Sequence, residues 1–321
     1  MNTAICTLFE GHYHHGVAAL SNSLFNKGYR GDIYVGYRGN LPEWILKGKI
    51  TELDKWEKVY VVDENIGIQL FFIEIQTNYN LANYKPNFML DLINGPAKKI
   101  DSIFYFDTDI IVNQSWSCYE EWVNCGVALC EDVNSPLQKY HPRRVGWRKY
   151  FKNLNLNFKN DIYVNAGFIG LSKNNFSFLE IWFKVQEIMS PAIGGLENSI
   201  FSNQDYNSTV LKLKGFQFFD KPDQDALNAA IEVYDDVISY FGKNGMGFSG
   251  ANFMMYHALG PYKPWNVSYL IRSLKGRSPR QLDFAYWKNT NYPFSVHSKF
   301  HIKKKIFSIY LAKFICRFYK V

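Results

Sequence analysis

The sequence predicts an α/β protein with a mainly parallel sheet flanked by helices. Two observations carry this prediction. Short apolar runs typical of buried strands alternate with stretches of helical spacing, which is the pattern of βαβ units. The chain has 321 residues, of which 47% are hydrophobic and 20% charged, and this globular composition allows a large buried core.

The individual elements follow from local patterns, taken in chain order. The apolar runs expected to be strands cover residues 3–9, 32–37, 58–62, 103–106, 127–130 and 163–171. Apolar side chains at helical spacing predict helices over residues 17–25, 82–93 and 176–189, with Gly28 ending the first and Pro86 near the start of the second. A loop is expected over residues 10–14. Residues 134–160 are polar, basic and rich in Asn, and we expect a surface loop region there.

The formal charge of +7 lies in one segment. Residues 299–321 contain seven Lys or Arg and no acidic residue, which leaves 29 basic and 29 acidic residues in the rest of the chain. A neutral body argues against nucleic-acid binding, which usually needs basic groups over a folded face. A basic segment rich in aromatic residues indicates an anionic membrane surface as the partner instead.

A helix over residues 303–320 would divide this segment into two sides. The apolar side would carry Phe307, Leu311, Phe314, Ile315 and Phe318, and the other side Lys305, Lys313, Arg317 and Lys320. This is the pattern of an amphipathic helix that lies in the plane of a membrane. The alternative is a helix packed on the rest of the protein with its charges solvated.

Cysteine usage and the start of the chain bear on the compartment. The five cysteines are Cys6, Cys118, Cys125, Cys130 and Cys316; they are odd in number and lack CxxC spacing, which argues against a disulfide framework or a zinc ribbon. The first ten residues lack the features of a signal peptide, and no run of about 18 uncharged apolar residues is present. We therefore expect a cytoplasmic protein that is peripherally attached to a membrane.

Two carboxylates, Asp107 and Asp109, interrupt an apolar run at the end of an expected strand. In an extended chain residues i and i+2 point to the same side, and ligands of open α/β sheets bind beyond the carboxyl ends of the strands. Such a pair can hold a divalent cation, which can neutralise a diphosphate. A pair of solvated turn carboxylates is the alternative, although the apolar flanks argue against it because burying unpaired carboxylates is costly.

Two later segments carry further polar groups. His257, Gly260 and Lys263 offer a metal ligand, a close backbone approach and a phosphate counter-charge; the alternative is a loop with a packed Trp and a hydrogen-bonded His. Asp223 and Gln224, at the start of an expected helix, could bind sugar hydroxyls, or Asp223 could be an N-cap.

In this order the segments resemble glycosyltransferase family 8, the retaining sugar transferases that include glycogenin and bacterial lipopolysaccharide galactosyltransferases. The resemblance covers about residues 3–265. It rests on the opening strand and loop with Tyr13, Phe104-Tyr105-Phe106-Asp107-Thr108-Asp109, Val164-Asn165-Ala166-Gly167, Asp223-Gln224-Asp225-Ala226-Leu227-Asn228 and His257-x-x-Gly260-x-x-Lys263-Pro264-Trp265. It implies a GT-A fold, a single Rossmann-like α/β domain, here over residues 1–298 and followed by the basic tail, residues 299–321.

The resemblance also implies a role for each site residue. Asp107, Asp109 and His257 would hold Mn²⁺, which suits two oxygens and an imidazole better than Mg²⁺, the other candidate ion. Thr7, Glu10 and Tyr13 would line the uridine site, with Tyr13 stacking on the base, and Gly260 and Lys263 would hold the diphosphate. The donor sugar would be faced by Asn165, Ala166 and Gly167, and by Lys85 in place of the Arg usual in the family. Asp223 and Gln224 would flank its reactive face. A rival pair, Gln204-Asp205, lies in the longer than usual stretch before Asp223.

The function predicted in this way is that of a metal-dependent retaining glycosyltransferase. It would move a hexose from a nucleotide sugar, a UDP-sugar, to a saccharide or lipid-linked acceptor in surface polysaccharide or lipopolysaccharide synthesis. Gln224 would stabilise positive charge near the anomeric carbon or position the acceptor, and a double displacement through Asp223 is the alternative route. Two other functions stay open, namely a GT-A transferase that inverts or uses another nucleotide, and a non-catalytic protein that binds a nucleotide sugar.

Overall fold

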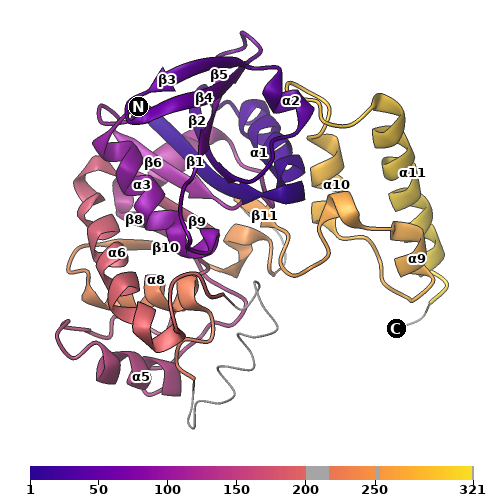
Figure 1. Ribbon diagram of the computed structural model, residues 1–321. Coiled ribbons are helices and arrows are strands. Elements are labelled where there is room, and N and C mark those ends of the chain that lie inside the picture. Colours follow the sequence, from indigo (N-terminus) through magenta and orange to yellow (C-terminus); the bar gives the residue numbers. More distant parts are fainter. Residues whose placement is uncertain (200–216, 250–253, 320–321) are drawn as a thin grey trace.

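The structure is a computed structural model that describes residues 1–199, 217–249 and 254–319 (Figure 1). Its strands are β1 (Thr3–Glu10), β2 (Gly31–Arg38), β3 (Lys49–Leu53), β4 (Trp56–Asp63), β5 (Ile68–Glu74), β6 (Ser102–Phe106), β7 (Ile110–Val112), β8 (Val127–Cys130), β9 (Phe168–Ser172), β10 (Ile238–Phe241) and β11 (Met255–His257). Its α-helices are α1 (His14–Asn26), α2 (Glu43–Leu46), α3 (Lys85–Asn94), α4 (Trp116–Trp122), α5 (Pro142–Tyr150), α6 (Ser177–Met189), α8 (Pro222–Val233), α9 (Tyr269–Ser273), α10 (Gln281–Lys288) and α11 (Lys299–Cys316).

A large sheet in the order β10-β8-β9-β6-β1-β2-β5-β4-β3 forms the centre of the described part of the chain. Strands β6, β1, β2 and β5 pair in parallel, as do β8 and β10, whereas β4 and β9 run against their neighbours. A separate antiparallel pair, β7 and β11, lies outside this sheet. The predicted α/β fold with a mainly parallel sheet flanked by helices is therefore confirmed.

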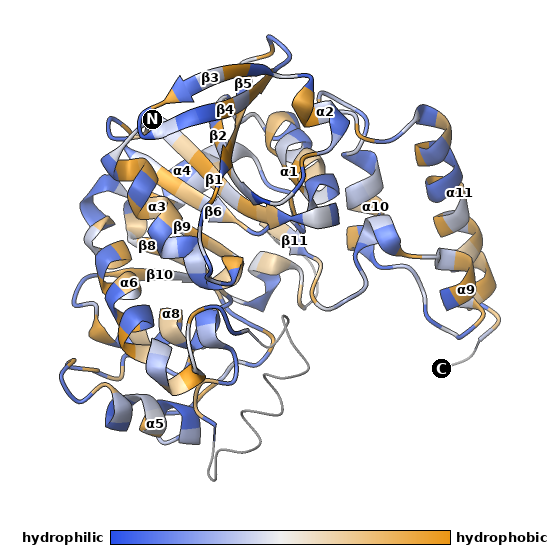
Figure 2. Cartoon of the chain, viewed as in Figure 1, coloured by the Kyte–Doolittle hydropathy of each residue, from blue (hydrophilic) through white to orange (hydrophobic). Residues whose placement is uncertain are grey.

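Helices cover both faces of the sheet, which explains the unbroken apolar runs of its strands. In β1, Ala4, Cys6 and Leu8 belong to the core that also contains side chains of α3, α5, α6 and α8. Ile5 and Phe9, which alternate with them, belong to the core that contains side chains of α1, α2 and α4. Figure 2 shows the resulting pattern, with apolar strands at the centre and polar residues on the outer sides of the helices.

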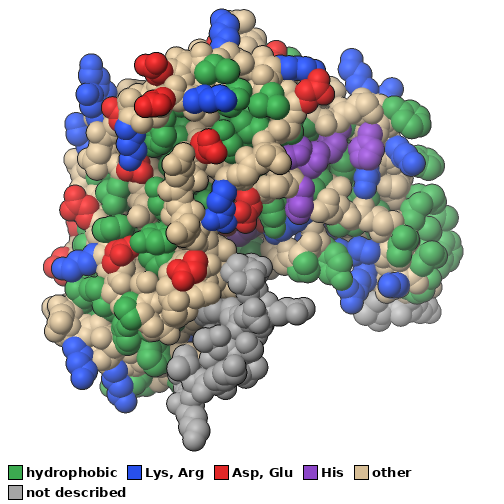
Figure 3. Space-filling model, viewed as in Figure 1, with side chains coloured by type: hydrophobic (Ala, Val, Ile, Leu, Met, Phe, Trp, Pro, Cys, Tyr) green, Lys and Arg blue, Asp and Glu red, His purple; other side chains and the backbone are tan. Residues whose placement is uncertain are grey.

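A third core joins the C-terminal helices to the rest of the protein. Trp287 of α10 and Ile302, Ile309 and Ala312 of α11 pack in one cluster with Ile111 of β7. Helix α11 is the outermost element on this side of the molecule (Figure 1), and exposed hydrophobic side chains gather along its outer edge (Figure 3). Within the described residues, no helix is both long enough and apolar enough to cross a bilayer.

Two predictions about local structure were wrong in part. Within the expected surface loop over residues 134–160, residues 142–150 form α5, which buries Trp147 and the guanidinium of Arg144, paired with buried Glu232. A polar composition therefore did not mean that the whole segment is exposed, because one of its charges, that of Arg144, is paired inside the protein. The strand expected over residues 163–171 begins only at Phe168, and the preceding residues are irregular apart from a bridge between Val164 and Glu131.

Candidate functional site

The two carboxylates lie on a tight turn between β6 and β7. The backbone N–H of Ile110 donates to the carbonyl oxygen of Asp107 at 3.1 Å, so the chain turns here instead of staying extended as the sequence predicted. The turn is not a solvated one, because Asp109 is only 8% exposed. Gly16 of α1 packs against it so closely that a Cβ atom would lie 2.2 Å from the carbonyl oxygen of Thr108.

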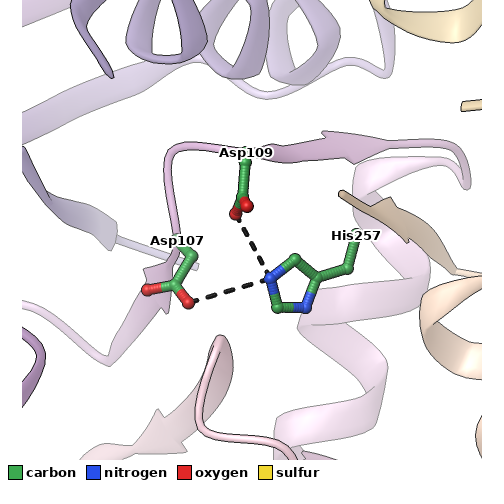
Figure 4. Close-up of side chains that lie close together, drawn as sticks. All are labelled: Asp107, Asp109 and His257. Carbon is green, nitrogen blue, oxygen red and sulfur yellow. Dashed lines mark ion pairs between the residues drawn. The ribbon is translucent and has the colours of Figure 1, made fainter. Parts of the chain in front are cut away.

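Pairing of β11 with β7 brings His257 to this turn. His257 lies opposite Ile110 in the antiparallel register, and the backbone N–H of Ala258 donates to the carbonyl oxygen of Asp109 at 3.0 Å. The Nε2 atom of His257 is 3.2 Å from Oδ1 of Asp109 and 3.8 Å from Oδ2 of Asp107 (Figure 4). One potential ligand atom from each residue lies within 4.8 Å of the others, an arrangement that the described residues form nowhere else.

This group fits a divalent cation. Two carboxylates and an imidazole are a donor set suited to Mn²⁺. A Cβ atom on Gly167 would lie 2.6 Å from Cε1 of His257 and 3.0 Å from Oδ2 of Asp107, so a glycine is needed to keep the space beside both ligands open. Asp107, Asp109 and His257 are therefore a candidate metal centre, as the sequence predicted.

Two buried lysines flank the carboxylates. Lys263 Nζ forms an ion pair with Asp109 and donates to the carbonyl oxygen of Ala258 at 2.7 Å. Lys85 Nζ is 3.1 Å from Asp107 and 3.4 Å from Asp223, and donates to the carbonyl oxygen of Ala166 at 2.8 Å. Burial alone would raise the pKa of Asp109, but His257 and Lys263 beside it hold that pKa below its usual value. The carboxylate of Asp109 is thus ionised.

The expected donor-sugar residues lie next to Lys85. The backbone N–H of Ala166 donates to Oε1 of Gln224 at 3.3 Å, while Nε2 of Gln224 is buried with no hydrogen-bond partner among the described residues. Asp223 at the start of α8 meets Lys85, so the sequence-predicted residues of α3, α8 and the segment before β9 converge. The side chain of Asn165 is occupied within the protein, since it donates to Asp132 at 2.7 Å and accepts from the backbone N–H of Gly167 at 2.8 Å.

The expected nucleotide residues are brought together only in part. Tyr13 lies beside the metal centre, with Lys263 Nζ 5.8 Å from its ring centroid and the ring of Trp265 packed edge-on at 5.6 Å. Thr7 is buried in β1, and its hydroxyl has no hydrogen-bond partner among the described residues. Glu10 ends β1 and pairs with Arg38 at 2.8 Å, and Gly260 is exposed with a φ of 78°. The rival pair Gln204-Asp205 lies outside the described residues.

Several polar residues of this region were assigned no role from the sequence. Tyr105 donates to Asp107 at 2.9 Å, and Asp132 accepts from Asn165. Asp225 is fully buried, accepts from the hydroxyl of Tyr163 at 2.7 Å and lies 3.7 Å from Arg143. Burial raises the pKa of Asp225 to about 7. In the sequence, Tyr105 and Asp225 stood out only as members of the two motifs that contain Asp107 and Asp223.

Comparisons with known proteins support the fold. No protein-family model and no curated protein sequence matches the chain. Among solved structures it is similar to the apo structure of the bifunctional glycosyltransferase WbbM, with a TM-score of 0.53 and 16% identity over 95% of this chain and 51% of that one. The chain thus spans about half the length of WbbM. It is also similar to the galactosyltransferase LgtC in complex with donor and acceptor sugar analogues, with a TM-score of 0.47 and 14% identity over 94% of this chain and 99% of that one. The likeness to WbbM is one of fold.

Proposed function

We propose that the protein is a glycosyltransferase that moves a hexose from a nucleotide sugar to a saccharide or lipid-linked acceptor, in surface polysaccharide or lipopolysaccharide synthesis. The observation that carries this proposal is the convergence of Asp107, Asp109 and His257 beside Lys263 and Lys85. The carboxylates follow the carboxyl end of β6, which is where ligands of open α/β sheets bind. A fold shared with a glycosyltransferase agrees with it.

On the nucleotide side, the residues present suit a uridine diphosphate. A bound Mn²⁺ would take up negative charge that develops on the leaving diphosphate. Lys263 would supply a positive charge to the same group from a buried position, where it acts with little screening by water. The exposed Gly260 has no side chain to hinder the approach of the phosphates. Tyr13 would stack on the base, while Thr7 and Glu10 would line the rest of the uridine site.

On the sugar side, Lys85, Asp223 and Gln224 would surround the reacting carbon. Gln224 would turn its amide toward a substrate oxygen, which would give the buried Nε2 the hydrogen-bond partner that it lacks among the described residues; leaving such a donor unpaired is costly. Lys85 holds Asp223 and Asp107 together, and thereby joins the sugar side to the metal side. Asn165, Ala166 and Gly167 would complete this wall. We propose retention of configuration by a front-face route, in which no carboxylate forms a covalent intermediate.

The proposal includes attachment to the cytoplasmic face of a membrane through α11 and its neighbour α9. Phe307 and Phe314 of α11 are 67% and 54% exposed, and Ile271 of α9, the helix in contact with α11, is 59% exposed. The basic residues Lys299, Lys303, Lys304 and Arg317 of this segment are exposed as well. An outward aromatic surface bordered by cations complements an anionic lipid surface, where each Lys or Arg contributes about 1 kcal/mol.

This helix differs in two ways from the sequence prediction. It covers residues 299–316, beginning four residues earlier than expected because the side chain of Ser298 caps it by accepting from the backbone N–H of His301. Lys305 and Lys313 do not join an outward basic side, because Lys305 donates to the carbonyl oxygen of Val267 and Lys313 lies over the ring of Phe284. The residues packed inward are Ile302, Ile309 and Ala312, which leaves the aromatic side free to meet lipid.

One experiment tests the enzymatic function directly. The protein is incubated with Mn²⁺ and a panel of UDP-, GDP-, CMP- and dTDP-sugars, with and without extracts of lipid-linked saccharides, and release of free nucleotide is measured. We expect release from one UDP-hexose, increased by an acceptor. Binding of a nucleotide sugar without any release would indicate a non-catalytic binding protein, and the anomeric configuration of the product, read by NMR, separates retention from inversion.

A further inference from the structure

Lys263 is bonded to a carboxylate that the candidate metal centre needs. Its Nζ atom has two acceptors, Oδ2 of Asp109 and the carbonyl oxygen of Ala258. The other oxygen of Asp109, Oδ1, faces Nε2 of His257 at 3.2 Å. Both oxygens of this carboxylate therefore already have a partner within the protein, and one of these partners is a full positive charge.

A lysine and a divalent cation in this place compete for the negative charge of one carboxylate, since Lys263 holds Oδ2 of Asp109 and Oδ1 faces His257. Lys263 is 8% exposed and Asp109 is 8% exposed, so neither charge is well hydrated and each needs a partner of opposite sign. A cation bound by Asp109 would place two positive groups side by side. Lys263 can leave only if another anion receives it, and its long flexible side chain allows that movement.

We infer that Lys263 is a built-in competitor of the metal, which moves from Asp109 to the diphosphate when a nucleotide binds. This inference rests on the proposed function, because it requires a metal on Asp107, Asp109 and His257 and a diphosphate within reach of Lys263. Its consequence is that metal and nucleotide bind with strong positive coupling. By linkage, each raises the affinity of the other by the same factor.

Titration of Mn²⁺ with and without UDP tests this inference. The fraction of free Mn²⁺ is followed by electron paramagnetic resonance for the wild-type protein, Lys263→Met and Lys221→Met. The Met variant keeps the apolar stem of the lysine and removes its charge. Lys221 is the matched control, since its Nζ lies 4.0 Å from Asp132 and it forms no ion pair with Asp107 or Asp109 in the described part of the chain. The melting temperature of each variant is measured to check that it is folded. Lys263→Gln serves as a second neutral variant.

The expected results are specific to Lys263. Wild-type protein should bind Mn²⁺ weakly alone and at least about tenfold more tightly with saturating UDP, which is within the usual range of coupling between sites. Lys263→Met should bind Mn²⁺ alone about tenfold more tightly than the wild type does, and UDP should then add less than about threefold. Lys221→Met should behave as the wild type.

The outcomes separate this inference from the proposed function. If folded Lys263→Met and Lys263→Gln bind Mn²⁺ alone no more tightly than the wild type, Lys263 does not compete with the metal and the inference is wrong. An equal gain in Lys221→Met would also overturn it, because the effect would then come from net charge alone. If the wild-type protein binds neither Mn²⁺ nor UDP under any condition, the proposed function itself fails.

Discussion

Gly167 leaves no room for a side chain beside His257. A Cβ atom on Gly167 would lie 2.6 Å from Cε1 of the imidazole, closer than such atoms approach in folded proteins. A glycine is needed at position 167 because its neighbours are so close. Its backbone conformation does not require one, since Gly167 is not among the glycines with positive φ. The backbone at this position is therefore one wall of the candidate metal centre.

The first prediction concerns that wall. Gly167→Ala should lower the affinity for Mn²⁺ by about tenfold or more, because the methyl group would displace His257 or Asp107, and misplaced ligands bind metals poorly. The affinity is measured by titration of free Mn²⁺. Gly242→Ala is the matched control, since a Cβ there would meet its nearest neighbour only at 3.7 Å. Unchanged binding in Gly167→Ala would contradict the placement of His257.

The second prediction concerns the requirement for metal. Asp109→Asn keeps the shape of the side chain and removes its charge, so Mn²⁺ binding and nucleotide release should both fall by at least about a hundredfold. The variant should also melt at a lower temperature, because Lys263 loses the partner of its buried charge. Wild-type activity should be lost in excess EDTA and restored by Mn²⁺. Full activity in EDTA would show that the reaction needs no metal.

The third prediction concerns the outward surface of α11. Replacing Phe307 and Phe314 together with Ser should abolish binding to vesicles containing anionic lipid without lowering the melting temperature, because both side chains are exposed. Co-sedimentation with vesicles at low salt measures the binding. Tyr140→Ser, which removes an aromatic ring that is 79% exposed elsewhere, is the control and should leave binding unchanged. If the wild-type protein does not bind such vesicles, the proposal that α11 attaches the protein to a membrane is wrong.

Truncation of the same helix should give a different result. A chain ending near residue 296 would lose Ile302, Ile309 and Ala312 from the third core. Removal of one buried Ile side chain already costs about 2–5 kcal/mol. We therefore expect truncation to destabilise the protein, in contrast to the surface variant, and thermal unfolding measures the difference.

The fourth prediction concerns acidic pH. The rings of His15 and His297 stack at 4.8 Å with an interplanar angle of 8°. Burial and neighbouring histidines lower the pKa of His15 to about 3, and burial together with His301, His14 and Lys305 lowers that of His297 to about 4. Histidines in the unfolded chain titrate near 6.5. Between the lowered pKa values of the folded protein and this value, the unfolded state therefore binds more protons than the folded state does. Stability from this stack is complete above about pH 6.5 and is lost as the pH falls toward 4.

A single variant isolates this effect. His15→Phe keeps a ring in the stack and removes one titrating group, so its melting temperature should fall less than that of the wild type between pH 7 and pH 4.5. Other titrating groups, such as Asp225, are common to both proteins and cancel in the comparison. Equal losses for the two proteins would mean that the stack does not sense pH.

The sequence by itself determined the local features of this protein. The strand over residues 3–9, the apolar flanks of Asp107 and Asp109, and the polar spacing of His257, Gly260 and Lys263 are all visible in the order of residues. Strands buried on both faces give unbroken apolar runs, and a charge set against such a run is a local signal. These features were enough to predict the α/β class, and together with the resemblance to glycosyltransferase family 8 they predicted the three candidate metal ligands.

Only the tertiary structure decided which distant groups meet and which faces stay free. The approach of His257 to Asp109 depends on the register of β7 against β11, and the contact of Lys85 with Asp223 depends on the packing of α3 near α8. Helix α5 and the inward lysines of α11 could likewise not be predicted from the sequence. The sequence does not distinguish a charge that is paired inside the protein from one that is solvated. Pairing register and packing are long-range properties, and no local pattern of residues fixes them.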